Sequence, residues 1–245
     1  MIADVHGNLP ALEAVLSDPH DALICLGDLV GYGPHPGPCV RRVLERATVA
    51  LRGNHDHALA AGVGSGCRPS FQWLADATAS LGLAQLSPAE RAALGALPLR
   101  AEDTIDGIRY HMVHATPSDP LHRYLPRDSE AWEGEVEQIS ADIVLVGHTH
   151  LQFRREAAGR MILSPGSVGQ PRDGDTRAAY AVIEDGTISF CRVAYAVERT
   201  VSALERSGVE SAAAAVLGQL LRTGRASPFL TDPEPAAPTL AHRAS

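Results

Sequence analysis

Short apolar runs that end in glycine, histidine or charged residues recur through the first 150 positions of the chain. Four of them are "ALICLGD" (22–28), "TVALRGN" (48–54), "YHMVHA" (110–115) and "DIVLVGH" (142–148). Runs of this length that are rich in Val, Ile and Leu are typical of strands buried on both faces, as in a parallel sheet covered by helices. The pattern therefore predicts strands whose carboxyl ends carry polar residues.

Apolar residues at helical spacing fill the intervals between these runs. They occur in "LPALEAVL" (9–16), "PCVRRVLERA" (38–47) and "SPAERAALGAL" (87–97). The third segment has a start signal, with Ser87 as N-cap, Pro88 at the first helical position and Glu90 two residues later. Beyond residue 150, short strand-like runs alternate with turns at 157–160, 172–175 and 184–186, which indicates an antiparallel portion. Two more helices are predicted near 198–206 and 209–222.

The pattern also divides the chain and raises a question about its start. Residues 1–222 are predicted to form a single domain, and residues 223–245, with four prolines and little periodicity, a flexible tail rich in Pro and Ala. Only three residues precede Asp4, whereas a strand usually has about five. We therefore expect the natural start to lie upstream of Met1.

Composition narrows the class of protein. The 245 residues carry a net charge of -8, which disfavours stable binding to nucleic acids or acidic membranes. No run approaches the ~20 apolar residues that span a bilayer, and "MIADVHGNLP" lacks the pattern of a secretory signal. The four scattered cysteines are predicted to be reduced packing residues. These observations predict a cytoplasmic protein.

Polar residues that can bind metal follow the predicted strands. In chain order they are Asp4, His6 and Asn8; Asp28; Asn54, His55 and Asp56; His114; and His148 and His150. The carboxyl ends of the strands in an open α/β sheet meet at one edge, so these side chains are expected to share one site. Carboxylate, imidazole and amide ligands without thiolate suit manganese, iron, zinc or similar ions such as nickel. Each block is weak evidence alone, and their joint placement carries the prediction.

The order DxH, GD, GNHD, H and GHxH, each after an apolar run, resembles the calcineurin-like metallophosphoesterase superfamily over residues 3–170. The segment "SPGSVGQPRDGD" (164–175) extends the resemblance toward a branch of small bacterial phosphoesterases and phosphodiesterases, in which asparagine usually occupies the place of Ser164. The resemblance implies an α/β fold, a four-layer α-β-β-α sandwich with two central mixed sheets and a dinuclear metal site at the strand ends. Its implied ligands are Asp4, His6 and His150 for one divalent ion, Asn54, His114 and His148 for the other, and Asp28 as a bridge between them.

The resemblance also implies an activity, the hydrolysis of small phosphomonoesters or phosphodiesters, with nucleotides among the candidates. Two divalent ions supply a charge of +4, and two aspartates and a bridging hydroxide leave the site positive, so an acidic protein can receive an anionic substrate. Paired ions at about 3.5–4 Å can generate hydroxide at neutral pH and clamp the oxygens of a displaced phosphoryl group. The alternative is a non-catalytic metal-binding or protein-interaction module on the same fold. The sequence leaves the substrate, the native metals and the oligomeric state open.

Further roles follow from the resemblance or from position. His55 is implied to face the scissile ester as an acid, beside Asp28 in the catalytic group. Two residues keep two interpretations: Asn8 bonds a ligand carboxylate or caps the next helix, and Asp56 orients His55 or stabilises the first turn of a helix. We expect His57 either to be solvated or to contact a ligand without binding metal itself, and His111 to be a packing residue.

One departure from better-known relatives concerns the second block. Protein serine/threonine phosphatases and the symmetrical diadenosine tetraphosphate hydrolases continue it as GDxxDRG, in which the aspartate supports the acidic histidine and the arginine binds phosphate. This chain has "GDLVGYGP", with Gly31 and Tyr32 at those places. Both subfamilies are therefore disfavoured. Arg172 is a weak candidate for binding the substrate phosphate, since guanidinium geometry suits phosphate.

Overall fold

The three-dimensional structure, a computed structural model, describes residues 1–226. The helices are α1 (Leu9–Leu16), α2 (Pro36–Arg46), α3 (Asn54–Ala61), α4 (Pro69–Gln85), α5 (Pro88–Ala96), α6 (Trp132–Val136), α7 (Val197–Arg206) and α8 (Ser211–Thr223). The strands are β1 (Ile24–Cys25), β2 (Val49–Ala50), β3 (Arg100–Ile105), β4 (Ile108–Val113), β5 (Ile143–Leu145), β6 (Gln152–Ala157), β7 (Arg160–Pro165), β8 (Ala178–Glu184) and β9 (Thr187–Val193). Most of the predicted tail, residues 227–245, lies outside the described residues, and the domain boundary stays a prediction.

Five strands form one mixed sheet in the order β3-β4-β5-β7-β6. Its centre is parallel, with Tyr110 opposite Ile143 between β4 and β5 and Val144 opposite Ile162 between β5 and β7. The hairpins β3–β4 and β6–β7 add the two antiparallel edges. The carboxyl ends of β4, β5 and β7 therefore lie at one end of the sheet, and the hairpin turns lie at the other.

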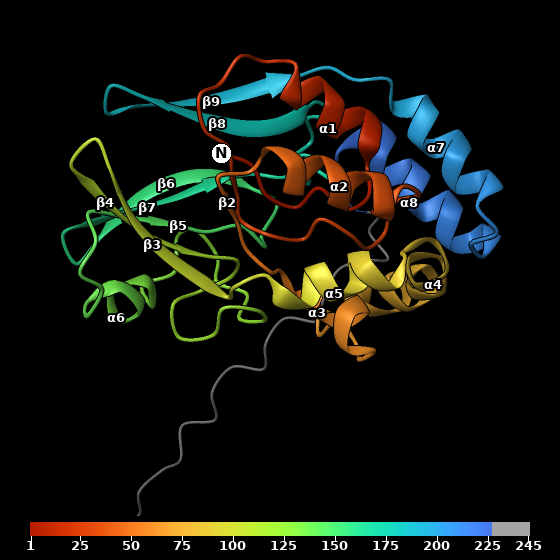
Figure 1. The fold of residues 1–245 in the computed structure, drawn as a ribbon, viewed down its shortest axis with the longest axis horizontal. Coiled ribbons are helices and arrows are strands. Elements are labelled where there is room, and N and C mark those ends of the chain that lie inside the picture. Colours follow the sequence, from red (N-terminus) through yellow and green to blue (C-terminus); the bar gives the residue numbers. More distant parts are fainter. Residues whose placement is uncertain (227–245) are drawn as a thin grey trace, which may run out of the picture.

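A second layer of strands is completed by the first residues of the chain. Ile2 forms a parallel bridge with Cys25 of β1, and β1 pairs in parallel with β2. On the other side, the backbones of Met1 and Ala181 exchange hydrogen bonds of 2.8 and 3.0 Å, which join this segment to the antiparallel pair β8–β9. The order of this layer is β2, β1, residues 1–3, β8 and β9 (Figure 1).

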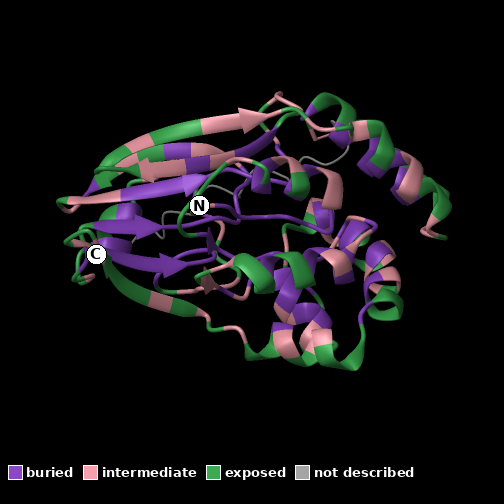
Figure 2. Ribbon diagram, turned by 45° about the horizontal axis from the view of Figure 1, so that its top comes forward, coloured by how far each residue is buried: buried purple, intermediate pink, exposed green. Residues whose placement is uncertain are grey.

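Apolar side chains fill the space between the two layers of strands and cover their outer faces. The inner core includes Leu26, Met112 and Leu145. Outside the second layer, α1 and α2 pack over residues such as Cys25 of β1, while α6 covers the five-stranded sheet with Trp132 (Figure 1). This is the mixed four-layer α/β fold that the resemblance implied, and the central strands β4, β5 and β7 are the most buried of the five-stranded sheet (Figure 2).

The predicted helices agree with the structure where their capping signals are strong. α1 covers residues 9–16 as predicted, and α5 begins with a capping box in which the Glu90 N–H donates to Ser87 Oγ at 3.2 Å. α7 and α8 lie where two helices were expected, with α8 ending at Thr223. The predicted turn at 172–175 is corrected: it is a bend in the connection from β7 to β8 and joins no hairpin.

The strands that lead to the polar residues are shorter than their apolar runs. β5 has three residues although the run spans 142–148, because the backbone leaves the sheet and turns at His148, where φ is 65°. Helices α4 and α6 have no counterpart among the predicted elements, and α3 was indicated only by the interpretation of Asp56 as a residue of a helix's first turn. Among the described residues, no helix is both long enough and apolar enough to cross a membrane.

Candidate metal centre

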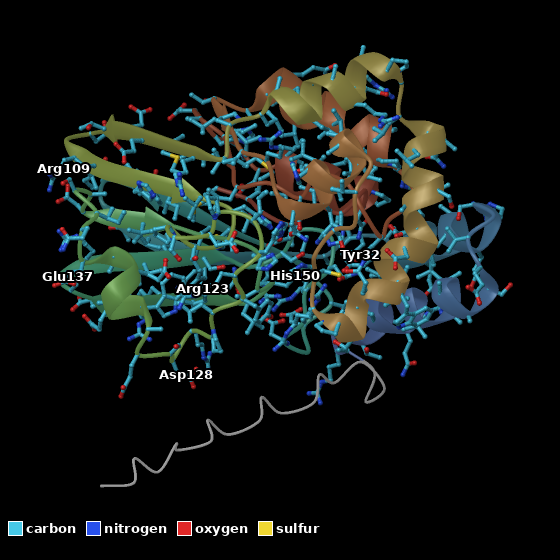
Figure 3. All side chains as sticks on the ribbon, turned by 90° about the horizontal axis from the view of Figure 1, so that it is seen from below. Tyr32, Arg109, Arg123, Asp128, Glu137 and His150 are labelled. Atoms are coloured by element: carbon cyan, nitrogen blue, oxygen red, sulfur yellow. The ribbon has the colours of Figure 1, made fainter. Side chains whose placement is uncertain are left out.

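The polar residues that follow the strands converge at one end of the sandwich. They come from residues 4–6, the segment after β1, the start of α3, and the segments after β4 and β5. All seven proposed ligands are buried, the most exposed being His148 at 7%. In Figure 3, His150 lies between the strand region and the helices, near Tyr32. The structure therefore brings together residues that are up to 146 positions apart in the sequence.

One group contains Asp4, His6 and His150, with candidate ligand atoms that lie within 4.8 Å of one another. The Nδ1 of His6 is 3.0 Å from the Val30 carbonyl oxygen, and the Nδ1 of His150 is 2.6 Å from that of Gln170. Because a carbonyl only accepts, both Nδ1 atoms carry hydrogen, which leaves a lone pair on each Nε2. These two Nε2 atoms face each other at 3.0 Å. Two facing lone pairs repel unless a cation lies between them.

The second group contains Asn54, His114 and His148 beside Asp28. The His114 Nδ1 donates to the Leu26 carbonyl at 2.9 Å, and its Nε2 lies 3.1 Å from Asn54 Oδ1. The orientation of Asn54 is fixed because its Nδ2 donates to the Ser65 carbonyl at 2.9 Å. Asp28, acting against burial, raises the pKa of His114 to about 9, so this ring carries a proton on Nε2 at neutral pH. A divalent ion bound here would replace that proton.

Asp28 lies between the two groups. Its Oδ1 accepts the backbone N–H of His55 at 2.9 Å, whereas its Oδ2 lies 3.7 Å from His6 Nε2 and 3.3 Å from His114 Nε2. One carboxylate oxygen thus faces ligands of both groups, as a bridging ligand must. Asp4 supplies a further indication, because its buried Oδ2 has no hydrogen-bond partner in the described part of the chain.

The pKa values show how burial and charge act on these groups. Burial, reinforced by Asp28, raises the pKa of Asp4 to about 7 against the opposing effect of His114. His114 and His55 hold the pKa of Asp28 well below its usual range, although burial opposes them. Burial lowers the pKa of His148 to about 3 and those of His6 and His150 well below the ordinary value. These three imidazoles are neutral at neutral pH, the form that binds metal.

The backbone at the centre is strained. Positive φ angles occur at six non-glycine residues that surround it: Asp4 (54°), His6 (46°), Asp28 (56°), Tyr32 (55°), His148 (65°) and His150 (62°). The left-handed conformation costs about 1–3 kcal/mol for such residues and persists only where the surrounding structure enforces it. Five of the six are proposed ligands. The strain therefore falls on the residues whose side chains point into the centre, and it lowers the stability of the fold.

Asp56 fixes the backbone that carries Asp28. Its carboxylate accepts N–H groups from Asp28 and Leu29, both at 2.8 Å, and from Gly53 at 3.0 Å. Gly53 itself must lack a side chain, because a Cβ there would lie 2.1 Å from Asp28 Oδ1. Of the two interpretations of Asp56, the structure shows the helix-start role, extended to the neighbouring loop, and shows no bond from Asp56 to the His55 ring.

His55 faces the centre from the first turn of α3. Its ring packs against Tyr32, with centroids 4.5 Å apart, and edge-on against His6 at 5.0 Å. Gly31 makes room for it, since a Cβ at this residue (φ +88°) would lie 2.6 Å from His55 Nδ1. Burial lowers the pKa of His55 to about 4. The ring is therefore neutral in the free protein at neutral pH.

Asn8 and Arg172 are the two remaining site residues that the sequence analysis named. Asn8 caps α1, accepting the Ala11 N–H at 3.4 Å, and its Nδ2 donates to the Gly169 carbonyl at 2.8 Å. Its hydrogen-bond partners in the described part of the chain include no ligand carboxylate, so the structure shows the capping interpretation. The Arg172 guanidinium donates to Gln170 Oε1 at 2.6 Å and stacks on Phe71 at 3.9 Å. Its charge lowers the pKa values of His55 and the three neutral imidazoles, which places it toward the centre.

Two histidines considered in the sequence analysis lie outside the centre. His57 is half-buried on α3 and His111 bonds Glu102 through Nδ1 at 2.9 Å, as expected for a packing residue. Sequence reasoning missed Tyr32 as a neighbour of His55. The available signal was its place directly after Gly31 in the loop that follows Asp28, where a shape-determining "GYGP" segment approaches the same strand ends.

Comparisons with known proteins agree with this geometry. The family model for the calcineurin-like phosphoesterase superfamily domain matches residues 1–186. An uncharacterized protein from Methanocaldococcus jannaschii is 31% identical over 92% of this chain and 97% of its own length. The crystal structure of a metallophosphoesterase from Sphaerobacter thermophilus is similar, with 32% identity, a TM-score of 0.78, and coverage of 91% of this chain and 97% of that one.

A hypothetical protein from Pyrococcus horikoshii shares the fold with a TM-score of 0.78, at 19% identity over 92% of this chain and 98% of that one. The extent of the family match and the identity to relatives that align along nearly their whole lengths settle the classification. This chain belongs to the calcineurin-like phosphoesterase superfamily.

Proposed function

We propose that this chain is a dinuclear metal-dependent phosphoesterase that hydrolyses small phosphomonoesters or phosphodiesters, with nucleotides among the candidate substrates. The observation that carries the proposal is a pair of neutral imidazoles whose acceptor atoms face each other without hydrogen between them, with His6 Nε2 and His150 Nε2 3.0 Å apart. Such a contact is unfavourable in a buried site unless a cation occupies it. Beside it, His114 Nε2 lies 3.1 Å from Asn54 Oδ1 and 3.3 Å from Asp28 Oδ2, which forms an adjoining group of candidate ligands.

The residues fit two divalent ions. Asp4, His6 and His150 would hold one ion, Asn54, His114 and His148 the other, and Asp28 would join them through Oδ2, in a hard-to-borderline ligand set suited to Mn, Fe, Zn or Ni. Ions held there would supply an activated water nucleophile and positive charge for the phosphate. The carbonyl partners of the three imidazole Nδ1 atoms fix the rings in the required orientation.

The residues around the ligands complete the proposed site. His55 would donate a hydrogen bond to the leaving oxygen. The negative charge of a bound phosphate would favour the protonated ring, which could then release its proton to that oxygen. Proton transfer of this kind typically raises the rate by about 10²–10⁴-fold. Arg172 would bind a phosphate oxygen from the side of Phe71, because its charge faces the centre. Tyr32 would keep the His55 ring in place by packing against it.

The first experiment measures hydrolysis of nitrophenyl phosphate and bis-nitrophenyl phosphate after chelator treatment and addition of manganese, nickel or zinc. We expect metal-dependent turnover, and the preferred substrate separates monoesterase from diesterase activity. His55→Ala should keep its metal content and lose about 10²–10⁴-fold in turnover, most for poor leaving groups. His20→Ala, at an exposed histidine beyond α1, is the control and should keep wild-type turnover. Wild-type turnover in His55→Ala would remove the role of His55, and no turnover with any metal would favour the non-catalytic alternative.

A further inference from the structure

A second concave site lies away from the metal centre, between α3 and α5 and the end of α4 (Figure 1). The cleft has a volume of about 580 Å³, within the range of about 300–1,000 Å³ that is typical of small-molecule sites. Apolar groups form much of its wall, among them Leu83, Leu86 and Pro88. Leu83 is 39% exposed, so a large apolar side chain faces solvent here.

Two arginines give this cleft its charge. Arg52 lies just before α3, and its Nη1 donates to the Gly95 carbonyl at 2.8 Å on α5. Arg91 lies on α5, and its Nε donates to the Leu59 carbonyl at 3.2 Å on α3. Each guanidinium therefore reaches across to the opposite helix. The groups they meet are neutral carbonyls, so their charges remain uncompensated.

The other residues that line the cleft do not offset the charge of the two arginines. Its residues include Arg52, Arg91 and His57 and no aspartate or glutamate, in a chain whose net charge is -8. Within the described residues, neither arginine forms an ion pair, and the buried Arg52 Nε and His57 Nδ1 have no hydrogen-bond partner. A buried polar group without a partner is unfavourable, and an acceptor brought to this wall would relieve that cost.

We infer that the cleft between α3 and α5 binds a small anion that carries an apolar group. The sulfonate, phosphate or carboxylate of such a ligand would bond Arg52 and Arg91 in the fork geometry that guanidinium groups offer. Its apolar part would cover Leu83, Leu86 and Pro88. The ligand would touch both ends of the segment 52–57, which contains Asn54 and His55, so the cleft is placed to influence the metal centre. Binding itself does not depend on the proposed phosphoesterase activity.

The test uses the full chain as purified and 8-anilinonaphthalene-1-sulfonate, which joins an anion to an aromatic body, with affinity measured by titration calorimetry. We expect saturable binding at one site, and binding at least about 10-fold weaker for the double variant R52Q/R91Q, because charge-assisted hydrogen bonds are lost. The neutral analogue N-phenyl-1-naphthylamine should bind at least about 10-fold more weakly than the sulfonate, by the same loss. The control R46Q/R127Q removes two exposed arginines elsewhere and should bind like the wild type.

A second variant protects the test against loss of folding. Ala92→Trp places a large side chain at an exposed position of the cleft and retains both arginines, so it should block the probe while circular dichroism and the thermal midpoint stay near those of the wild type. The inference is overturned if the sulfonate fails to bind, or if it binds the folded R52Q/R91Q or A92W protein as it binds the wild type. Binding at the metal centre would give that second result.

Discussion

The two ends of the paired sheets both contain non-glycine residues with left-handed backbone. At the hairpin end, Asp106 (φ 52°), Ala158 (45°) and Asp185 (48°) are each followed by a glycine in a two-residue turn between antiparallel strands. This is the geometry that two-residue hairpins require. At the metal end, Asp4 and His148 adopt the same conformation without a following glycine and are 0% and 7% exposed.

The difference shows where the two ends obtain their stability. A hairpin turn is favoured by its own residues, so the left-handed conformation there is mostly a local property. At the metal end, the strain is held by contacts from distant segments, such as the four N–H groups of residues 28, 29, 30 and 53 that bond Asp56. Tertiary contacts therefore maintain the arrangement of the ligands. Substitutions at the two ends should have different consequences for stability and metal binding.

The largest contrast is expected for removal of a carboxylate at each end. Asp28→Ala should lower metal content and reduce turnover by at least about 100-fold, since even partners that only support a ligand are worth about 10–100-fold. Asp106→Ala, at an exposed turn with the same φ sign, should leave both unchanged. Metal analysis and nitrophenyl phosphate turnover measure the effects. Equal losses in the two variants would show that the contrast between the ends is wrong.

A second contrast concerns glycines. Gly53→Ala would place a Cβ 2.1 Å from Asp28 Oδ1 and 2.4 Å from Asp28 N, both held in place. We expect the free energy of unfolding to fall by about 1–3 kcal/mol or more, together with metal affinity. Gly134→Ala is the control: it lies in α6 with no atom within 4 Å of the added Cβ, and alanine there should stabilise by up to about 1 kcal/mol. Urea unfolding compares the two, and an unchanged midpoint for Gly53→Ala would contradict the account.

At the hairpin end, a substitution within one turn should increase the stability of the fold. Ala158→Asn would create an Asn-Gly pair in the turn between β6 and β7, and asparagine tolerates positive φ better than alanine does. We expect a gain of less than about 1 kcal/mol in the free energy of unfolding, with turnover unchanged. Thermal and urea unfolding measure it. A loss of stability would mean that this turn, like the metal end, is dictated by its surroundings.

The smallest expected effect is a pH dependence at the same end. The Arg109 guanidinium bonds Asp142 at 2.8 and 3.1 Å, and this pairing lowers the pKa of Asp142 to about 2 from 3.8. Because the folded pKa is depressed, the stabilisation is present above pH 4 and is lost as the pH falls toward 2. Asp142→Asn should therefore flatten the stability profile slightly between these pH values. A profile identical to the wild type would show that this exposed pair contributes nothing.

The sequence predicted the fold and the grouping of ligands because both depend on patterns that can be recognised in the sequence alone. Apolar runs followed by Asp28, Asn54, His114 and His148 indicate strand ends, and strand ends in such sheets converge. Capping signals such as Ser87 placed helices well. Helix α4 was missed because its buried positions, Phe71, Leu74, Ala75, Thr78 and Gly82, mix apolar with polar or small residues.

The remaining features depend on distant contacts that no local pattern reveals. The contact between Tyr32 and His55 results from the left-handed backbone at residues 31 and 32, which is unusual for tyrosine and follows from the packing around it. The orientation of Arg172 is set by Phe71 and Gln170, and the cleft between α3 and α5 exists only once three separate segments have packed. Sequence reasoning can nominate such residues but cannot place them.

The most direct test of the central claim is the metal content of the folded full-length protein, measured by mass spectrometry after exposure to excess manganese or zinc and removal of unbound ions. The account predicts two divalent ions per chain, because the candidate ligand atoms around Asp28 form two adjoining groups. A well-folded protein that retains neither ion would contradict it.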